Sequence, residues 1–319
     1  MYVAFFNSLL TQSKRIIDRV AGSVAVFDPV FAHRAGIQPA SAIPRHLAIT
    51  TVIAFSSSLV AIIVAVTIGQ AQRAPSVDEG RRLFFNARYR EAAEAALACQ
   101  PSTADEELAR DELRASGLLF QIRGLLEPGD PKRQGRPQTL ERCTECGDLI
   151  AAFLAVTTHG QQAARKRLKS NPSDTVALFF LGKIDLNYVW LQLGPLHRRT
   201  GWNEYWEARR SLDAVLKADP DHVRARIARA WIDYIVDTRI PWGVRWVLGG
   251  GDKKKALAAL RQTADDDAGE YDHAEAMFSL WEMLVRERQV AEATAVAERL
   301  AEMFPENSEV ATFLEAKRR

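Results

Sequence analysis

Small and turn-forming residues recur in this sequence at a constant interval of 48 residues. The recurring pairs are Gly182 and Ala230, Ala208 and Ala256, and Pro172 and Pro220. A fixed period of about 20–50 residues is typical of repeat proteins, in which each unit buries its apolar face only against its neighbours. Between these positions apolar residues follow the three- and four-residue spacing of helices, and strand signals are missing. The chain beyond residue 74 is therefore predicted to be an all-α array of helical repeats.

Three segments share a short turn, an alanine early in a helix, and a stop at or beside a proline. They are Asn203–Pro220, Arg288–Pro305 and Asn86–Gln100, the last of which is followed by Pro101. The interval from Ala208 to Pro220 equals that from Ala293 to Pro305, at 12 residues. The agreement indicates that these segments are equivalent helices in successive repeats.

The runs Tyr205-Trp206-Glu207-Ala208 and Tyr89-Arg90-Glu91-Ala92 resemble the start of the second helix of a tetratricopeptide repeat. Gly80 lies 12 residues before Ala92, where such a repeat has the small residue that lets its two helices approach. The resemblance implies a right-handed superhelix of tetratricopeptide-like hairpins. The last repeat departs from the pattern, because Trp281 stands at its small position.

The two middle repeats are longer than the first. Gly182 precedes Ala208 by 26 residues, and Ala230 precedes Ala256 by the same number, so each holds a 14-residue insertion. Trp and Arg are enriched at interaction hot spots. The residues predicted to contact a partner are Trp202, Trp206, Trp242, Trp246, Arg198 and Arg245. The alternative is that these bulky residues anchor long connections between helices.

No charged residue occurs from Leu47 to Gln72, a run of 26 residues. A helix of about 20 such residues crosses a membrane. A buried core helix and a cleaved signal peptide are the alternatives, but 46 residues precede the run and its apolar stretch is long for a signal peptide. We therefore predict one retained transmembrane helix. The expected location is the bacterial inner membrane, with the N-terminus cytoplasmic and the helical domain periplasmic.

The segment before this run has the pattern of an amphipathic helix. Its apolar positions are Phe5, Phe6, Leu9, Leu10, Ile16, Ile17 and Val20, and its opposite face is polar and basic. A helix of this kind lies in the membrane interface, so these residues are predicted to contact the lipid bilayer. Docking onto a membrane subunit of a partner is the alternative.

The predicted organisation has five parts. They are a tail (1–45), a transmembrane helix (46–72), a first helical unit (73–123), a linker loop (124–138) and the main array (139–319). The linker is assigned because residues 124–138 are rich in Gly, Pro and charge. The residues after Pro305 are predicted to form the capping helix that an array needs to cover its last apolar face.

Three cysteines offer the only candidate chemistry, and most readings of them fail. Cys143 and Cys146 form a C-x-x-C, but Gly147 stands where a c-type haem site needs histidine, and no second pair exists for zinc. The first expectation is three unpaired cysteines buried on helices. The alternative is a disulfide from Cys99 to Cys143 or Cys146, which an oxidising compartment would permit. We predict no metal, no cofactor and no catalytic site.

Other motifs are excluded on their spacing. Gly249-Gly250-Gly251 followed by Asp252 and three lysines lacks the pattern of a phosphate-binding loop, so Asp252 is predicted to be a helix N-cap. A formal net charge of +2 gives no general attraction to nucleic acid. No small-molecule substrate is evident.

The layout also resembles bacterial envelope proteins that hold a repeat array on one N-terminal anchor. The resemblance implies a non-catalytic scaffold or accessory subunit that binds protein partners in a membrane complex. Two alternatives remain open. One is a chaperone-like module that holds client peptides in the concave groove, and the other is a redox carrier or enzyme built around Cys143 and Cys146.

Overall fold

The computed structural model describes residues 74–126 and 140–318, apart from residues 197, 199, 241 and 267. The described residues belong to one compact unit, Arg73–Arg319. The predicted tail (1–45) and transmembrane helix (46–72) lie outside the described residues, so the predicted anchor stays a prediction.

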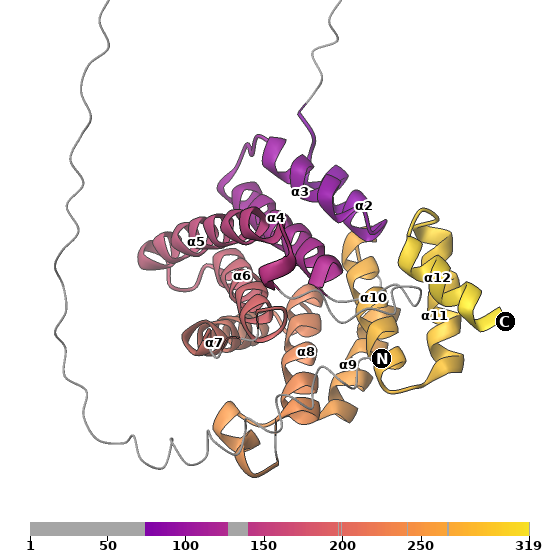
Figure 1. Ribbon diagram of the computed structural model, residues 1–319. Helices are drawn as coiled ribbons and strands as arrows, with labels where there is room; N and C mark the ends of the chain where they lie inside the picture. Colours follow the sequence, from indigo (N-terminus) through magenta and orange to yellow (C-terminus); the bar gives the residue numbers. More distant parts are fainter. Residues whose placement is uncertain are drawn as a thin grey trace, which may run out of the picture. The chain divides into compact units, whose positions relative to one another are not determined.

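The described residues form helices and no strand, which confirms the all-α prediction (Figure 1). The α-helices are α2 (Val77–Phe85), α3 (Tyr89–Ala98), α4 (Ala104–Leu126), α5 (Cys146–Ser170), α6 (Thr175–Leu193), α7 (Trp202–Ala218), α8 (Val223–Arg239), α9 (Lys253–Asp265), α10 (Glu270–Arg286), α11 (Val290–Met303) and α12 (Ser308–Arg318). Two 3-10 helices, η1 (Leu140–Arg142) and η2 (Trp242–Leu248), lie in the connections before α5 and α9.

Local sequence explains where several helices begin. The side chain of Ser76 accepts a hydrogen bond from the backbone N–H of Glu79 (3.1 Å), and Asp174 accepts one from Ala177 (2.9 Å). The side chain of Asp252 accepts hydrogen bonds from the backbone N–H groups of Lys254 and Lys255, both at 3.0 Å. These bonds satisfy donors that have no partner inside the helix. The prediction that Asp252 is an N-cap is confirmed.

Consecutive helices pack on each other in pairs, from α2 with α3 to α10 with α11. The small residues predicted at the contacts lie there. A Cβ added at Gly182 would lie 2.8 Å from Leu212 Cγ and 3.3 Å from the carbonyl oxygen of Ala208. One added at Gly80 would lie 3.7 Å from the carbonyl oxygen of Ala92. The backbones of α2 and α3, and of α6 and α7, therefore approach where the spacing predicts.

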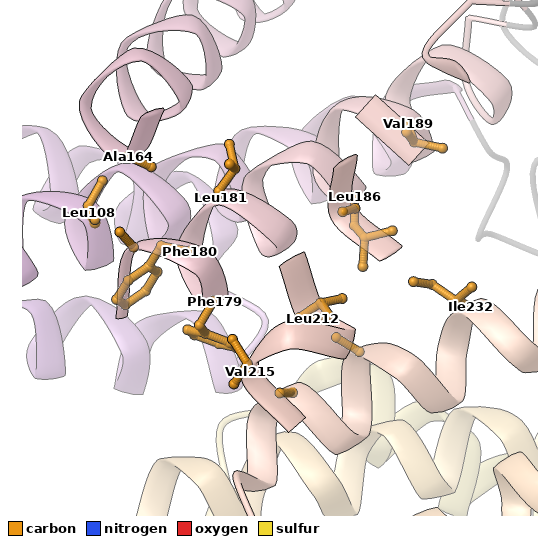
Figure 2. Packing of buried hydrophobic residues seen from close by; sticks show 14 of the residues in the cluster. Leu108, Ala164, Phe179, Phe180, Leu181, Leu186, Val189, Leu212, Val215 and Ile232 are labelled. Carbon is orange, nitrogen blue, oxygen red and sulfur yellow. The ribbon is translucent and has the colours of Figure 1, made fainter. Parts of the chain in front are cut away.

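The core runs from one helix pair to the next. Leu181 on α6, Leu212 on α7 and Ile232 on α8 are all fully buried and belong to one cluster, which also reaches Leu108 on α4 (Figure 2). By length and composition α6 could span a membrane, and it is the only described helix of that kind. It is mostly buried in the fold and carries the buried Asp185, so it is the core helix of this unit.

The connection between α4 and α5 differs from the predicted linker. Helix α4 continues to Leu126, beyond the predicted linker start at residue 124. Ile122 and Leu126 on α4 pack in one cluster with Cys146 and Phe153 on α5. The segment therefore connects two helices that pack together within one compact unit, and it does not separate a first unit from the array.

The first and last parts of the array contact each other, which the repeat pattern does not predict. The ring of Phe85, at the end of α2, lies 5.5 Å from that of Phe304 and 5.5 Å from that of Phe278 on α10. Asn307 donates a hydrogen bond to the carbonyl oxygen of Phe85 (2.7 Å), and Tyr89 donates one to the carboxylate of Glu309 (3.0 Å). We call this contact between Phe85–Tyr89 and Phe304–Glu309 the closure. It joins α2 to α10, and α3 to the start of α12 (Figure 1).

Candidate functional site

The second insertion exposes two tryptophans. Trp242 is 84% exposed and Trp246 is 77% exposed, and both lie on η2 with the half-exposed Val247. The indole N–H of Trp246 donates to the carbonyl oxygen of Gly243 (3.1 Å). The ring of Trp246 can therefore enter an apolar environment without leaving a donor unpaired. Large apolar side chains gathered on a surface mark interaction sites. We call residues 242–248 the aromatic loop.

The aromatic loop is held firmly from two helices beneath it. Arg245 donates to the carbonyl oxygen of Ile240 (2.8 Å) and forms an ion pair with Asp237 on α8. From α7, Tyr205 donates to the carbonyl oxygen of Leu248 (2.9 Å), and Arg209 donates to the same oxygen (3.1 Å). These bonds fix the backbone of the loop that carries the two exposed rings before any partner arrives, which lowers the entropic cost of binding.

The glycine run after the loop has a structural purpose. Gly249 and Gly250 have φ angles of 78° and 73°, which only glycine adopts readily. A Cβ at Gly251 would lie 2.6 Å from the carbonyl oxygen of Asp233 and 2.6 Å from the backbone nitrogen of Asp237. The three glycines therefore return the chain from the exposed loop to the surface of α8 and start α9.

The other predicted contact residues have different surroundings. Trp202, at the start of α7, is 41% exposed, and its ring lies 6.4 Å from that of Tyr205. Trp206 is half-buried against the core cluster. The side chain of Arg198 is exposed, whereas that of Arg245 is engaged inside the loop. Sequence reasoning did not include Tyr205 among the contact residues, although its hydroxyl links α7 to the aromatic loop; its place between Trp202 and Trp206 was the available signal.

A second notable arrangement is a neutral cluster of four charged side chains from four helices. Lys183 on α6 lies 2.6 Å from Glu275 on α10 and 3.9 Å from Glu112 on α4. Arg224 on α8 lies 2.6 Å from Glu275 and 3.0 Å from Glu112. All four side chains are at least 83% buried. The exposed fraction is 17% for Lys183, 16% for Glu275, 11% for Arg224 and 7% for Glu112. We call this group the charge cluster.

The charge cluster is balanced electrostatically. Burial raises the pKa of Glu275, but Arg224 and Lys183 more than offset this effect and hold the pKa at about 2. The guanidinium of Arg224 also lies over the ring of Phe179, 4.9 Å from its centroid. Each of the four helices is the first of its pair, so the cluster ties one helix of each of four successive pairs together.

One buried carboxyl group is held in its neutral form. Asp185 on α6 is fully buried and accepts a hydrogen bond from Gln161 (2.7 Å). Burial and, next, the nearby carboxylate of Glu207 raise its pKa to about 8, although Arg165 lies 4.0 Å away. Arg165 forms its shorter contact with Glu207, at 2.5 Å. Asp185 therefore carries a proton at neutral pH, while Glu207 is ionised.

The raised pKa of Asp185 predicts a measurable effect of Asp185→Asn. The pKa of Asp185 is about 4 in the unfolded chain and about 8 in the folded protein. Between these pH values only the folded state keeps the carboxyl proton, so rising pH destabilises the protein. Asn is neutral at every pH and removes this dependence. We expect the variant to be about 1–3 kcal/mol more stable than the wild type at pH 8, with the gain vanishing towards pH 4. Urea unfolding at several pH values measures it. The exposed Asp221→Asn is the control, and a gain that does not change with pH would contradict the assignment.

The cysteines pair differently from the prediction. Cys143 and Cys146 form a disulfide with their Cα atoms 5.4 Å apart, and Cys99 is a buried free thiol. Both expected states, three unpaired cysteines and a bond from Cys99, are therefore wrong. The reason is local: the turn before α5, in which the N–H of Cys146 donates to the carbonyl oxygen of Cys143 (3.4 Å), already brings these two thiols together. Burial raises the pKa of the Cys99 thiol.

Within residues 74–126 and the described part of 140–318, no group of His, Cys, Asp and Glu side chains could hold a metal ion. The predicted membrane-contact residues Phe5, Phe6, Leu9, Leu10, Ile16 and Ile17 lie outside the described part of the chain. No family model, no curated protein and no solved structure matches this chain.

Proposed function

We propose that this chain is a non-catalytic, membrane-anchored scaffold or accessory subunit, which binds a protein partner of a membrane complex through the aromatic loop. The observation that carries the proposal is the pair Trp242 and Trp246, which are exposed on a segment fixed by Arg245, Tyr205 and Arg209. Leaving two large rings in water without a partner is unfavourable, and burying each ring contributes roughly 2–3 kcal/mol.

We propose further that the helix pairs are tetratricopeptide-like repeats. The close approach of α6 to α7 at Gly182, and of α2 to α3 at Gly80, supports this reading. The closure is a departure from an open superhelix, because Phe85 at the start of the array contacts Phe304 at its end.

The alternative of a client-binding module has less support. It requires an accessible concave groove, and the charge cluster links the four helices that would line one. A client would have to displace ion pairs whose partners are already buried, at a cost of several kcal/mol. The exposed aromatic side chains lie instead on the connection between α8 and α9.

The proposal is tested with the double variant Trp242→Ser, Trp246→Ser. The full-length protein is extracted in a mild detergent, the particle is sized, and its subunits are identified and counted by mass spectrometry. We expect the wild type to form a larger particle of fixed composition, and the double variant to be released from it without loss of helicity. The matched control is Leu97→Ser, which removes a 59% exposed leucine on α3. A double variant that stays in the particle would refute the assigned surface.

A further inference from the structure

The exposed apolar side chains of this fold gather in one kind of connection. Among the described residues, seven large apolar side chains are at least 40% exposed. Six of them lie in or next to the connections inside the helix pairs α6–α7, α8–α9 and α10–α11, namely Trp202, Trp242, Trp246, Val247, Val285 and Val290. The seventh is Leu97 on α3. None of the seven lies in the described parts of the connections that lead from one pair to the next.

The three connections lie side by side. Near the start of α7, Tyr205 donates a hydrogen bond to the carbonyl oxygen of Leu248, at the end of the aromatic loop (2.9 Å). Directly after the loop, Lys253 lies 2.7 Å from Glu287 in the connection between α10 and α11. The hydroxyl of Tyr234 on α8 donates to the same glutamate (2.9 Å). The six side chains therefore share one continuous surface. We call residues 200–203, 242–255 and 285–291 the turn edge.

The turn edge has an excess of positive charge. Lys254, Lys255 and Arg288 are exposed, and within the described residues none of these three side chains has a hydrogen-bond or ion-pair partner. The carboxylates of the edge are already engaged, because Asp252 caps α9 and Glu287 forms an ion pair. Free positive charge therefore stands beside the exposed rings of the aromatic loop.

The fold itself does not explain the two free lysines. They lie in the first turn of α9, where the helix dipole disfavours positive charge. Two cations, Arg224 and Arg226, lie in the first turn of α8 as well, but each is paired with a carboxylate. Lys254 and Lys255 have no such partner within the described chain. A negatively charged ligand would balance both.

We propose that the turn edge binds an acidic, partly apolar segment of the partner protein. The apolar side chains of the segment lie on the tryptophans of the aromatic loop, and its carboxylates lie on Lys254, Lys255 and Arg288. This inference rests on the proposed scaffold function and names the chemistry of its partner. Opposite charges across an interface steer the approach and fix the register, while large rings supply the apolar contact.

A protein segment fits the turn edge better than an anionic bilayer does. A bilayer takes up side chains that protrude from the protein, as those of Trp242 and Trp246 do. Trp202, Val285 and Val290 are only 40–42% exposed, so neighbouring atoms of the fold flank them. A protein partner can follow such recesses, because protein interfaces are packed to a complementary shape. A bilayer would reach the aromatic loop alone.

The first test maps the partner by photocrosslinking in cells that produce the full-length protein. The photocrosslinker p-benzoylphenylalanine replaces Asn203, Val247 or Ala291 in separate variants, so that each of the three connections carries one probe. Ala218, an exposed residue at the other end of α7, is the control position. Crosslinked peptides are identified by mass spectrometry. We expect all three probes to reach one segment of one protein that has more acidic than basic residues, and the probe at Ala218 to miss it.

The outcomes separate this inference from the scaffold proposal. Crosslinks to lipid, to a neutral or basic segment, or from the three probes to unrelated proteins would overturn the turn edge as the site of an acidic segment. A protein crosslinked through Val247 alone would also overturn it, yet would agree with a scaffold that binds through the aromatic loop. The absence of any protein crosslink from the three probes would contradict both.

The second test measures the contribution of charge. The crosslinked segment is synthesised as a fluorescent peptide, and its binding to the full-length protein in detergent is measured by anisotropy at about 50 and 300 mM salt. The test variant combines Lys254→Glu, Lys255→Glu and Arg288→Glu. The matched control reverses three exposed lysines at the other ends of α5 and α7, by Lys166→Glu, Lys169→Glu and Lys217→Glu.

We expect the test variant to bind the peptide at least about tenfold more weakly than the wild type, and the control to stay within about twofold. Higher salt should weaken the wild type and have little effect on the test variant. Equal losses in the test and control variants would show that only net charge matters, and the site would be wrong. Should the test variant lose helicity, the salt dependence of the wild type decides, and affinity that is independent of salt would overturn the proposal.

Discussion

Arg224→Met is expected to lower the free energy of unfolding by about 3–5 kcal/mol, although it replaces a charged side chain with an apolar one of similar length. The substitution leaves Glu275 and Glu112 buried with only Lys183 to balance them. An uncompensated buried carboxylate is costly because it has lost both water and its partner. Chemical unfolding of the full-length protein, followed by circular dichroism at pH 7, measures the change. Lys254→Met, at an exposed position on α9, is the control and should change stability by less than about 0.5 kcal/mol.

A double variant separates charge balance from packing in the same cluster. Adding Glu275→Gln to Arg224→Met removes one of the two unbalanced carboxylates, so we expect part of the lost stability to return. If the losses of unfolding free energy caused by Arg224→Met and by Glu275→Gln simply add in the double variant, Arg224 acts through packing alone. The acid response supplies a further check. The folded pKa of Glu275 is about 2, below its unfolded value, so its contribution is present above about pH 4.5 and is lost as the pH falls towards 2. Arg224→Met should weaken this acid-dependent loss.

Phe304→Ala is expected to cost about 3–5 kcal/mol and to open the closure selectively. The ring of Phe304 is 98% buried and contacts the rings of Phe85 and Phe278, which also contact each other. Its removal leaves a cavity where the first and last helices of the array meet, and the rest of the core is unchanged. Hydrogen exchange measured by mass spectrometry should show lost protection in α2, α3 and α12 before any loss in α6.

The matched control for the closure is Phe153→Ala. Phe153 is also fully buried, but it packs between α4 and α5, away from the ends of the array. We expect a similar loss of global stability, with the protection of α12 reduced no more than that of the core. If both variants lost protection in the same helices, the closure would not be a separately opening part of the fold.

The sequence was most informative where the physical cause is local. The helical spacing of apolar residues, the N-cap at Asp252 and the small residue at Gly182 each depend on a few neighbouring positions. The Trp-rich insertions were also recognisable from spacing. The sequence did not show which of these rings are exposed, because Trp206 and Trp246 are the same residue type and differ only in what the fold places over them.

The cysteines show the same limit in a smaller region. The sequence offered three thiols, and it left open only three unpaired cysteines or a long-range bond from Cys99. The turn before α5 decided otherwise, because it holds Cys143 and Cys146 within bonding distance and Cys99 is buried at the end of α3. The bond between neighbouring cysteines needs no distant segment to be in place.

By itself, the sequence determined that residues beyond 74 form helices, where several of them begin, and which backbones approach closely. These properties follow from periodicity and from contacts between near neighbours. Only the tertiary structure decided that α2 meets α10, that α3 meets α12, and that Glu112, Lys183, Arg224 and Glu275 form one neutral cluster. Such contacts join residues up to 222 positions apart, as between Phe85 and Asn307. They depend on the summed rotation of every helix pair, which no local pattern encodes.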